Sequence, residues 1–102
     1  MVVGILKVTL LLPENASLKG KRKVVKSLLG RLQSRFNVAA AEVADNDLWQ
    51  RAELGLAVVG NDRRFVNSVL DKLLDYIGRE TEAELLDSSL EIQTVFSGEG
   101  RG

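Results

Sequence analysis

The stretch VVGILKVTLLLP at residues 2–13, followed by SLKGKRKVVKSLLGRLQSRF at residues 17–36, decides the fold. The first part is rich in β-branched and large apolar residues and ends at Pro13, which predicts a strand. The second part begins at Ser17, a residue type that caps helices, and repeats apolar residues every three or four positions to about Arg35. The sequence therefore predicts a strand followed directly by an amphipathic helix.

Four further elements follow along the chain. Alternating apolar and polar residues predict two strands joined by a short link, which favours an antiparallel hairpin. A second helix, capped by Asn61 or Asp62, and a last strand with a bulge near Ser88 and Ser89 complete the pattern. The predicted ranges are 38–44 and 50–60 for the two strands, 61–78 for the helix and 83–96 for the last strand.

The predicted order β-α-β-β-α-β defines an α+β domain with the split βαβ, or ferredoxin-like, arrangement. In this arrangement a four-stranded antiparallel sheet carries two helices on one face. We expect a single domain over residues 1–97 and a disordered tail at 98–102. Even-numbered residues of the first strand should face the core, and Phe65 should pack in it from the second helix.

The opposite face of the sheet is expected to be more apolar than a fully solvated face. Its predicted members are Val3, Ile5, Leu11, Val38, Ala40, Ala57 and Val59, among the charged residues Lys7, Glu42, Arg51 and Glu53. A partner should cover this face, most simply a second copy of the chain in a homodimer.

The composition excludes several classes of chemistry. The 102 residues include no His and no Cys, which removes most metal ligands, thiol nucleophiles and general bases that titrate near neutral pH. We therefore expect no metal ion and no cofactor. No segment has the pattern of a signal peptide or of a membrane span, so a cytoplasmic location is expected.

The zero formal net charge conceals a strong asymmetry. Residues 1–35 hold eight Lys or Arg and one acid, whereas residues 36–102 hold six Lys or Arg and 13 acids. Most of the early cations lie at the start of the first predicted helix, where they can meet consecutive phosphates. The predicted site for RNA or another anion consists of Lys19, Lys21, Arg22, Lys23, Lys26 and Arg51. A solvated basic face without a ligand is the alternative.

The only Trp of the chain, Trp49, stands in a predicted loop close to Arg51. Its indole is predicted either to stack on a base or to anchor the loop over the end of the sheet. The acidic residues of the chain lack the spacing of a loop that binds a hard cation, so they are interpreted as charged linkers.

Two known functions of this architecture are disfavoured. Stacking of RNA on the sheet face needs aromatic residues on the central strands, and residues 50–60 contain none. Acylphosphatases have this size and strand order, but their first loop is a glycine-bearing phosphate cradle with an Arg, whereas residues 13–22 have the sequence PENASLKGKR. A small acylphosphatase-like enzyme that holds its anion with Arg22 is thus the least favoured function, and no catalytic residue is predicted.

Three segments together resemble the YlxP-like family of small bacterial proteins, a domain of unknown function. They are MVVGILKVTLLLPENASLKGKRKVVKSLL at residues 1–29, RFNVAAAEV at 35–43 and DLWQRAELGLAVVGND at 47–62, and the resemblance extends to about Asp87. It implies a ferredoxin-like fold, and genes that often lie beside those for transcription, translation and ribosome maturation. It implies no catalytic residue. It favours a binding protein that contacts RNA or the ribosome, with a protein-interaction or dimerisation module as the alternative.

Overall fold

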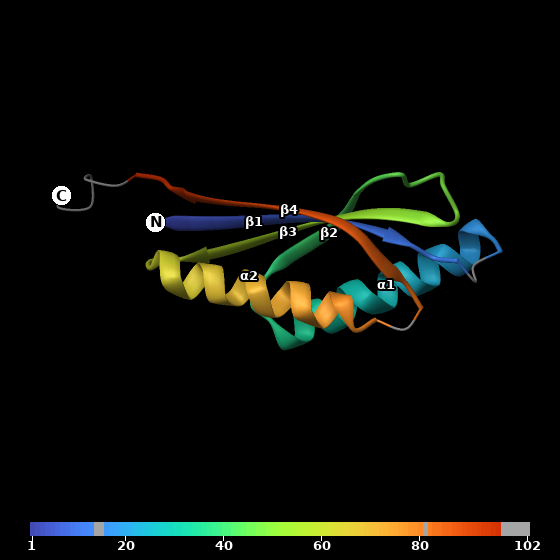
Figure 1. The fold of residues 1–102 in the computed structure, drawn as a ribbon, viewed down its shortest axis with the longest axis horizontal. Helices are drawn as coiled ribbons and strands as arrows, with labels where there is room; N and C mark the ends of the chain where they lie inside the picture. Colours follow the sequence, from blue (N-terminus) through green and yellow to red (C-terminus); the bar gives the residue numbers. More distant parts are fainter. Residues whose placement is uncertain (14–15, 81, 97–102) are drawn as a thin grey trace.

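Figure 1 shows the computed structural model of the chain, which describes residues 1–13, 16–80 and 82–96. Its elements are β1 (Val2–Leu11), α1 (Leu18–Arg35), β2 (Ala39–Ala44), β3 (Arg51–Gly60), α2 (Arg63–Gly78) and β4 (Glu84–Thr94). The predicted order is confirmed, and each predicted range is correct to within two residues at either end. The predicted tail at 98–102 lies outside the described residues.

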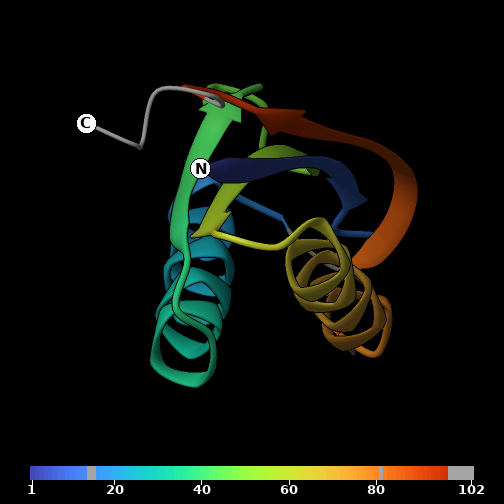
Figure 2. The same ribbon diagram turned by 90° about the vertical axis from the view of Figure 1, so that its left-hand side faces the viewer.

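The four strands form one antiparallel sheet in the order β2-β3-β1-β4. Both helices cover the same face of this sheet, as the view from the end of the molecule shows (Figure 2). Leu6, Val8 and Leu10 of β1 face the helices and are buried, as predicted. Their neighbours in β3 are also buried, so the core lies between the two central strands and the helices. The predicted α+β, ferredoxin-like fold is therefore confirmed.

Both helices begin at the predicted caps. The Ser17 hydroxyl accepts a hydrogen bond from the amide of Gly20 at 3.0 Å, and the Asp62 carboxylate accepts one from the amide of Arg64 at 3.1 Å. Each bond satisfies an amide that has no partner within its own helix. These two caps fix where α1 and α2 start beneath the sheet.

The two faces of β2 are reversed relative to the prediction. Ala40 and Glu42 pair with residues of β3 whose side chains face the helices, so both lie on the helix side of the sheet. Ala39 and Ala41 lie on the open side instead. The physical reason is the ion pair between Glu42 and Lys21. The Glu42 carboxylate lies 2.8 Å from the ammonium of Lys21 on α1, and this contact needs Glu42 on the helix side of the sheet. Val38, also predicted on the open face, packs against the core.

Phe65 is not part of the core, contrary to the prediction. Its side chain is 57% exposed in the first turn of α2, where the neighbouring Val66 takes the core position. A Cβ atom placed on Gly60 would lie 3.4 Å from the Phe65 ring, so one side of the ring rests on the end of β3. The remainder of the ring faces solvent.

The bulge in β4 lies at Leu86 and not at Ser88 and Ser89. Its register with β1 shifts where Thr9 pairs with Asp87 and the next residue, Leu10, pairs with Leu85. The extra residue between these pairs is Leu86, which is exposed. Leu85 thereby takes the position that faces the core.

Gly4 allows α2 to lie close to the sheet. It lies on the helix side of β1, where a Cβ atom would be 2.5 Å from Val66 Cγ1 and 2.8 Å from Leu70 Cδ1. No ordinary side-chain contact is that short, so any larger residue here must displace α2 or its side chains.

We expect Gly4→Ala to lower the free energy of unfolding by about 1–3 kcal/mol, because it overpacks the core. Gly30→Ala is the matched control. A Cβ atom at Gly30 of α1 would have no described atom within 4 Å, apart from the backbone of α1 and the two neighbouring residues. This variant should raise the free energy of unfolding by up to about 1 kcal/mol through helix propensity. Urea unfolding followed by circular dichroism measures both, and a Gly4→Ala variant as stable as the parent chain would contradict the close approach of α2.

Candidate anion-binding surface

The six predicted anion-binding residues separate into two groups. The first group is exposed on α1, and we call it the basic face; it consists of Lys19, Arg22, Lys23 and Lys26. The second group, Lys21 and Arg51, takes part in ion pairs within the chain. The structure thus brings four of the six predicted residues together on one surface.

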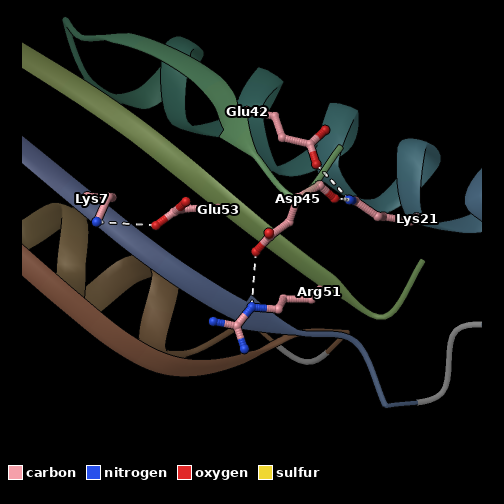
Figure 3. Close-up of polar contacts among 6 residues, drawn as sticks. All are labelled: Lys7, Lys21, Glu42, Asp45, Arg51 and Glu53. Atoms are coloured by element: carbon pink, nitrogen blue, oxygen red, sulfur yellow. Dashed lines mark hydrogen bonds and ion pairs between the residues drawn. The ribbon is translucent and has the colours of Figure 1, made fainter. Parts of the chain in front are cut away.

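Lys21 is fully buried, although it lies within the basic run of the sequence. Its ammonium lies 2.8 Å from Oε2 of Glu42 and also donates a hydrogen bond to the backbone carbonyl of Asp45 (Figure 3). Within the described part of the chain, Oε2 accepts no well-aligned hydrogen bond, so its contact with Lys21 is an ion pair. Lys21 joins α1 to the end of β2, and its charge is not at the surface.

Asp45 connects this buried pair to Arg51. Its backbone carbonyl accepts the bond from Lys21, while its carboxylate lies 3.0 Å from Nε of Arg51 (Figure 3). The φ angle of Asp45 is 61°, a left-handed conformation that Asp tolerates better than most residues. Arg51 extends on the open side of the sheet, on the same side as the ion pair between Lys7 and Glu53. It therefore lies across the sheet from the basic face.

Trp49 lies in the loop between β2 and β3, which stands on the side of the sheet away from the helices (Figure 1). Its side chain is about half exposed. The loop between β2 and β3 and the start of α1 lie toward the same end of the molecule, the loop on the side of the sheet away from the helices (Figure 1). Stacking of a base on this indole stays a prediction, as does its role as a loop anchor.

The cations of the basic face have no counter-charge among residues 1–13, 16–80 and 82–96. None of its four cations forms an ion pair with a carboxylate within the described residues, and the first turn of α1 contains no acid. The start of a helix carries a partial positive charge, so cations placed there are slightly destabilising. The arrangement therefore favours an external anion over a partner among the described residues.

A groove of about 520 Å³ runs between α1 and β2, beside the basic face. Its lining consists of Arg22, Val25, Lys26, Leu29, Gly30, Gln33, Ala40 and Glu42. Most of the lining surface is apolar, and Arg22 and Lys26 supply its exposed cations. At one end, Nε2 of Gln33 donates a hydrogen bond to the carbonyl of Ala40 at 3.2 Å. No sequence pattern predicts this groove, because it forms only when β2 packs beside α1.

A second group of cations lies at the other end of α1, but the fold explains it. Arg31 lies 2.7 Å from Glu80, whose side chain is almost fully buried, and Arg35 lies 5.2 Å from the centre of the Tyr76 ring. Partial burial lowers the pKa of Arg31, but the contacts with Glu80 and Tyr76 outweigh it, so the pKa lies above its ordinary value. These contacts join the two helices. Cations near the C-terminal end of α1 are also favourable, because that end of a helix carries a partial negative charge.

No group of three or more Asp or Glu side chains within residues 1–13, 16–80 and 82–96 is placed to hold a metal ion. None of the helices in these ranges is long and apolar enough to cross a membrane.

Comparison with known proteins places the chain in a family. Residues 3–90 match the family described as "Protein of unknown function (DUF503)". The chain belongs to this family. A relative from Bacillus subtilis (strain 168), named "Uncharacterized protein YlxP", is 34% identical over 83 residues, which cover 81% of this chain and 90% of the relative. The resemblance drawn from the sequence is therefore confirmed.

The fold also resembles a solved structure of unrelated sequence. "De novo designed protein Foldit4" is 13% identical and superposes with a TM-score of 0.55 over 92% of this chain and 98% of that protein. At this identity the likeness concerns the fold alone.

We expect Lys21→Met to lower the free energy of unfolding by about 3 kcal/mol, because it leaves the Glu42 carboxylate buried without its counter-charge. The double variant Lys21→Met with Glu42→Leu should recover most of this loss, since neither charge is then buried. Urea unfolding of the two single variants and the double variant measures the coupling. Strictly additive effects would contradict a direct pair between Lys21 and Glu42.

Proposed function

We propose that this protein binds RNA through the basic face of α1, with ribosome assembly or translation in the cytoplasm as its setting. The observation that supports the proposal is the basic face itself, where four exposed cations have no carboxylate partner within the described residues. The setting comes from the genes that often accompany this family.

The spacing of the four cations suits a phosphate backbone. From Lys19 to Lys26 the helix advances about 10 Å, and every turn in this stretch presents at least one cation to the same side. A polyanion that binds there releases condensed counterions, which is favourable at low salt. If all four cations contact phosphates, the affinity for a single strand should fall with a log–log salt slope of about −3.

The helix is a better candidate for RNA contact than the sheet. β1 and β3, the two central strands, contain no Phe, Tyr or Trp on which bases can stack. The open face instead has a central ion pair between Lys7 and Glu53 at 3.3 Å. RNA contact is therefore proposed at α1, through charge, and with little dependence on base sequence.

The triple variant Lys19→Ala, Arg22→Ala and Lys23→Ala should bind RNA at least ten-fold more weakly, because three phosphate contacts are lost. Its salt slope should be smaller in magnitude by about 2. Fluorescence anisotropy with a labelled 16-nucleotide RNA over a salt series measures both quantities.

A matched control removes the same charge from another surface. The triple variant Arg64→Ala, Lys72→Ala and Arg79→Ala changes three exposed cations of α2 and its C-terminal cap. It should retain nearly full RNA affinity. Equal losses in the two triple variants would assign the binding to overall charge and contradict a site on α1, as would a basic-face variant that binds like the parent chain.

As a second candidate function, we propose that the open face of the sheet forms a homodimer. The observation that favours it is a set of exposed apolar side chains, Ile5, Val43 and Val59, which are 40%, 55% and 60% exposed. Val43 lies over Gly55, where a Cβ atom would be 2.9 Å from its Cγ1. The pair between Lys7 and Glu53 neutralises two charges at the centre of this face.

We expect sedimentation velocity to show a dimer at tens of micromolar protein. Val59→Lys should convert it to a monomer, because two copies would then bury unpaired ammonium groups. Phe65→Lys, which changes an exposed apolar residue of α2 on the helix side of the sheet, is the control and should leave the dimer intact. A monomeric parent chain at these concentrations would contradict the dimer.

A further inference from the structure

We infer that the groove between α1 and β2 binds an extended acidic segment of a partner protein, which adds to the free edge of β2 as a fifth strand. This inference goes beyond the proposed binding of RNA and does not depend on it. It rests on the edge of the sheet, the lining of the groove and the charge beside it.

β2 is the end strand of the sheet and pairs only with β3 among the described residues. The outer edge of such a strand presents amide and carbonyl groups that another chain can bind. Figure 2 shows this edge beside α1, on the side of the molecule away from α2. The carbonyl of Ala40 already accepts a hydrogen bond from Gln33 at 3.2 Å, so an added strand displaces the Gln33 side chain there or pairs with the other groups of the edge.

The length of the groove matches an extended chain. Its lining on α1 runs from Arg22 to Gln33, a distance of about 16 Å along the helix axis. A strand of about five residues has the same length. The groove therefore offers a path for a short strand along its whole length, and β2 supplies main-chain partners over part of that path.

The lining specifies the chemistry of the segment. Val25, Leu29 and Ala40 make much of the groove apolar, and the absence of a side chain at Gly30 leaves room for a side chain of the partner. Arg22 and Lys26 place two exposed cations along the path, and the charge of Glu42, the acid of the lining, is paired with Lys21. The segment that fits has apolar residues at alternate positions, with Asp or Glu between them.

Other occupants fit the groove less well. Two copies of the chain joined edge to edge through β2 would carry their α1 helices on the same face, where the two basic faces would repel each other. A single strand of RNA has no amide and carbonyl pattern to complement β2, and no aromatic residue lines the groove. The opposite edge of the sheet, β4, contains Glu84, Asp87 and Glu91, which would repel an acidic segment.

The test uses a capped ten-residue peptide in which Val and Glu alternate. We expect it to bind the full chain and to slow hydrogen exchange of amides in β2, as measured by NMR on the labelled protein. A version N-methylated at every second residue should bind at least ten-fold more weakly, since it cannot complete the strand pairing. A version with Lys in place of Glu should also bind at least ten-fold more weakly, since it meets the two cations.

Variants of the groove distinguish this inference from the proposed binding of RNA. Gly30→Leu places a bulky side chain in the groove at a position where a Cβ atom meets no described side chain within 4 Å, and it should weaken binding of the peptide at least ten-fold. Ser34→Leu, an exposed position of α1 outside the groove lining, should have no effect. Lys19→Ala with Lys23→Ala, which lie outside the groove lining, should weaken RNA binding and leave the peptide affinity unchanged.

Several results would overturn the inference while leaving the proposed function intact. These are equal binding of the Lys peptide, a bound peptide that protects no amide of β2, and a Gly30→Leu variant with full affinity for the peptide. If Gly30→Leu weakened RNA binding and not peptide binding, the groove would belong to RNA. Failure of RNA to bind the parent chain, with normal peptide binding, would overturn only the proposed function.

Discussion

The ion pair between Lys21 and Glu42 fixes how the first half of the chain packs. Lys21 is on the buried side of α1, and its ammonium reaches both the Glu42 carboxylate and the Asp45 carbonyl at the end of β2. A buried pair of this kind adds little net stability over a pair of apolar residues, because both charges lose their hydration. We expect its effect to be on specificity, since the alternative arrangement of β2 would leave Lys21 buried without a counter-charge.

This pair buries one of the five cations at the start of α1 and leaves the other four exposed. With Lys21 turned inward, Lys19, Arg22, Lys23 and Lys26 necessarily face outward, because about 3.6 residues make one turn. The pair also holds one end of β2 against α1, while Gln33 contacts Ala40 at the other end. The groove and the basic face therefore depend on the same packing of one helix against one edge strand.

The sequence predicted the elements well, because strong apolar periodicity defines β1, β3 and both helices. It failed for the faces of β2, where the segment AAAEVA offers almost no contrast between its two sides, and the partner that decides the matter is 21 positions away in the sequence. One signal was available: Lys21 lies on the helical wheel beside Val25 and Leu28, within the apolar stripe. The exposed basic residues were predicted because charge and helical spacing suffice, whereas the groove depends on packing between elements.

The two proposed ligands meet at Arg22 and Lys26, which belong both to the basic face and to the lining of the groove. An acidic segment in the groove neutralises these two cations and leaves Lys19 and Lys23 for RNA. Each ligand then lowers the affinity of the other by the same factor, because coupling between two binding equilibria is reciprocal. If both proposals hold, the shared cations would let α1 exchange RNA for a protein partner without a change in fold. Gly30 would keep the groove open to the partner despite its cost to the helix.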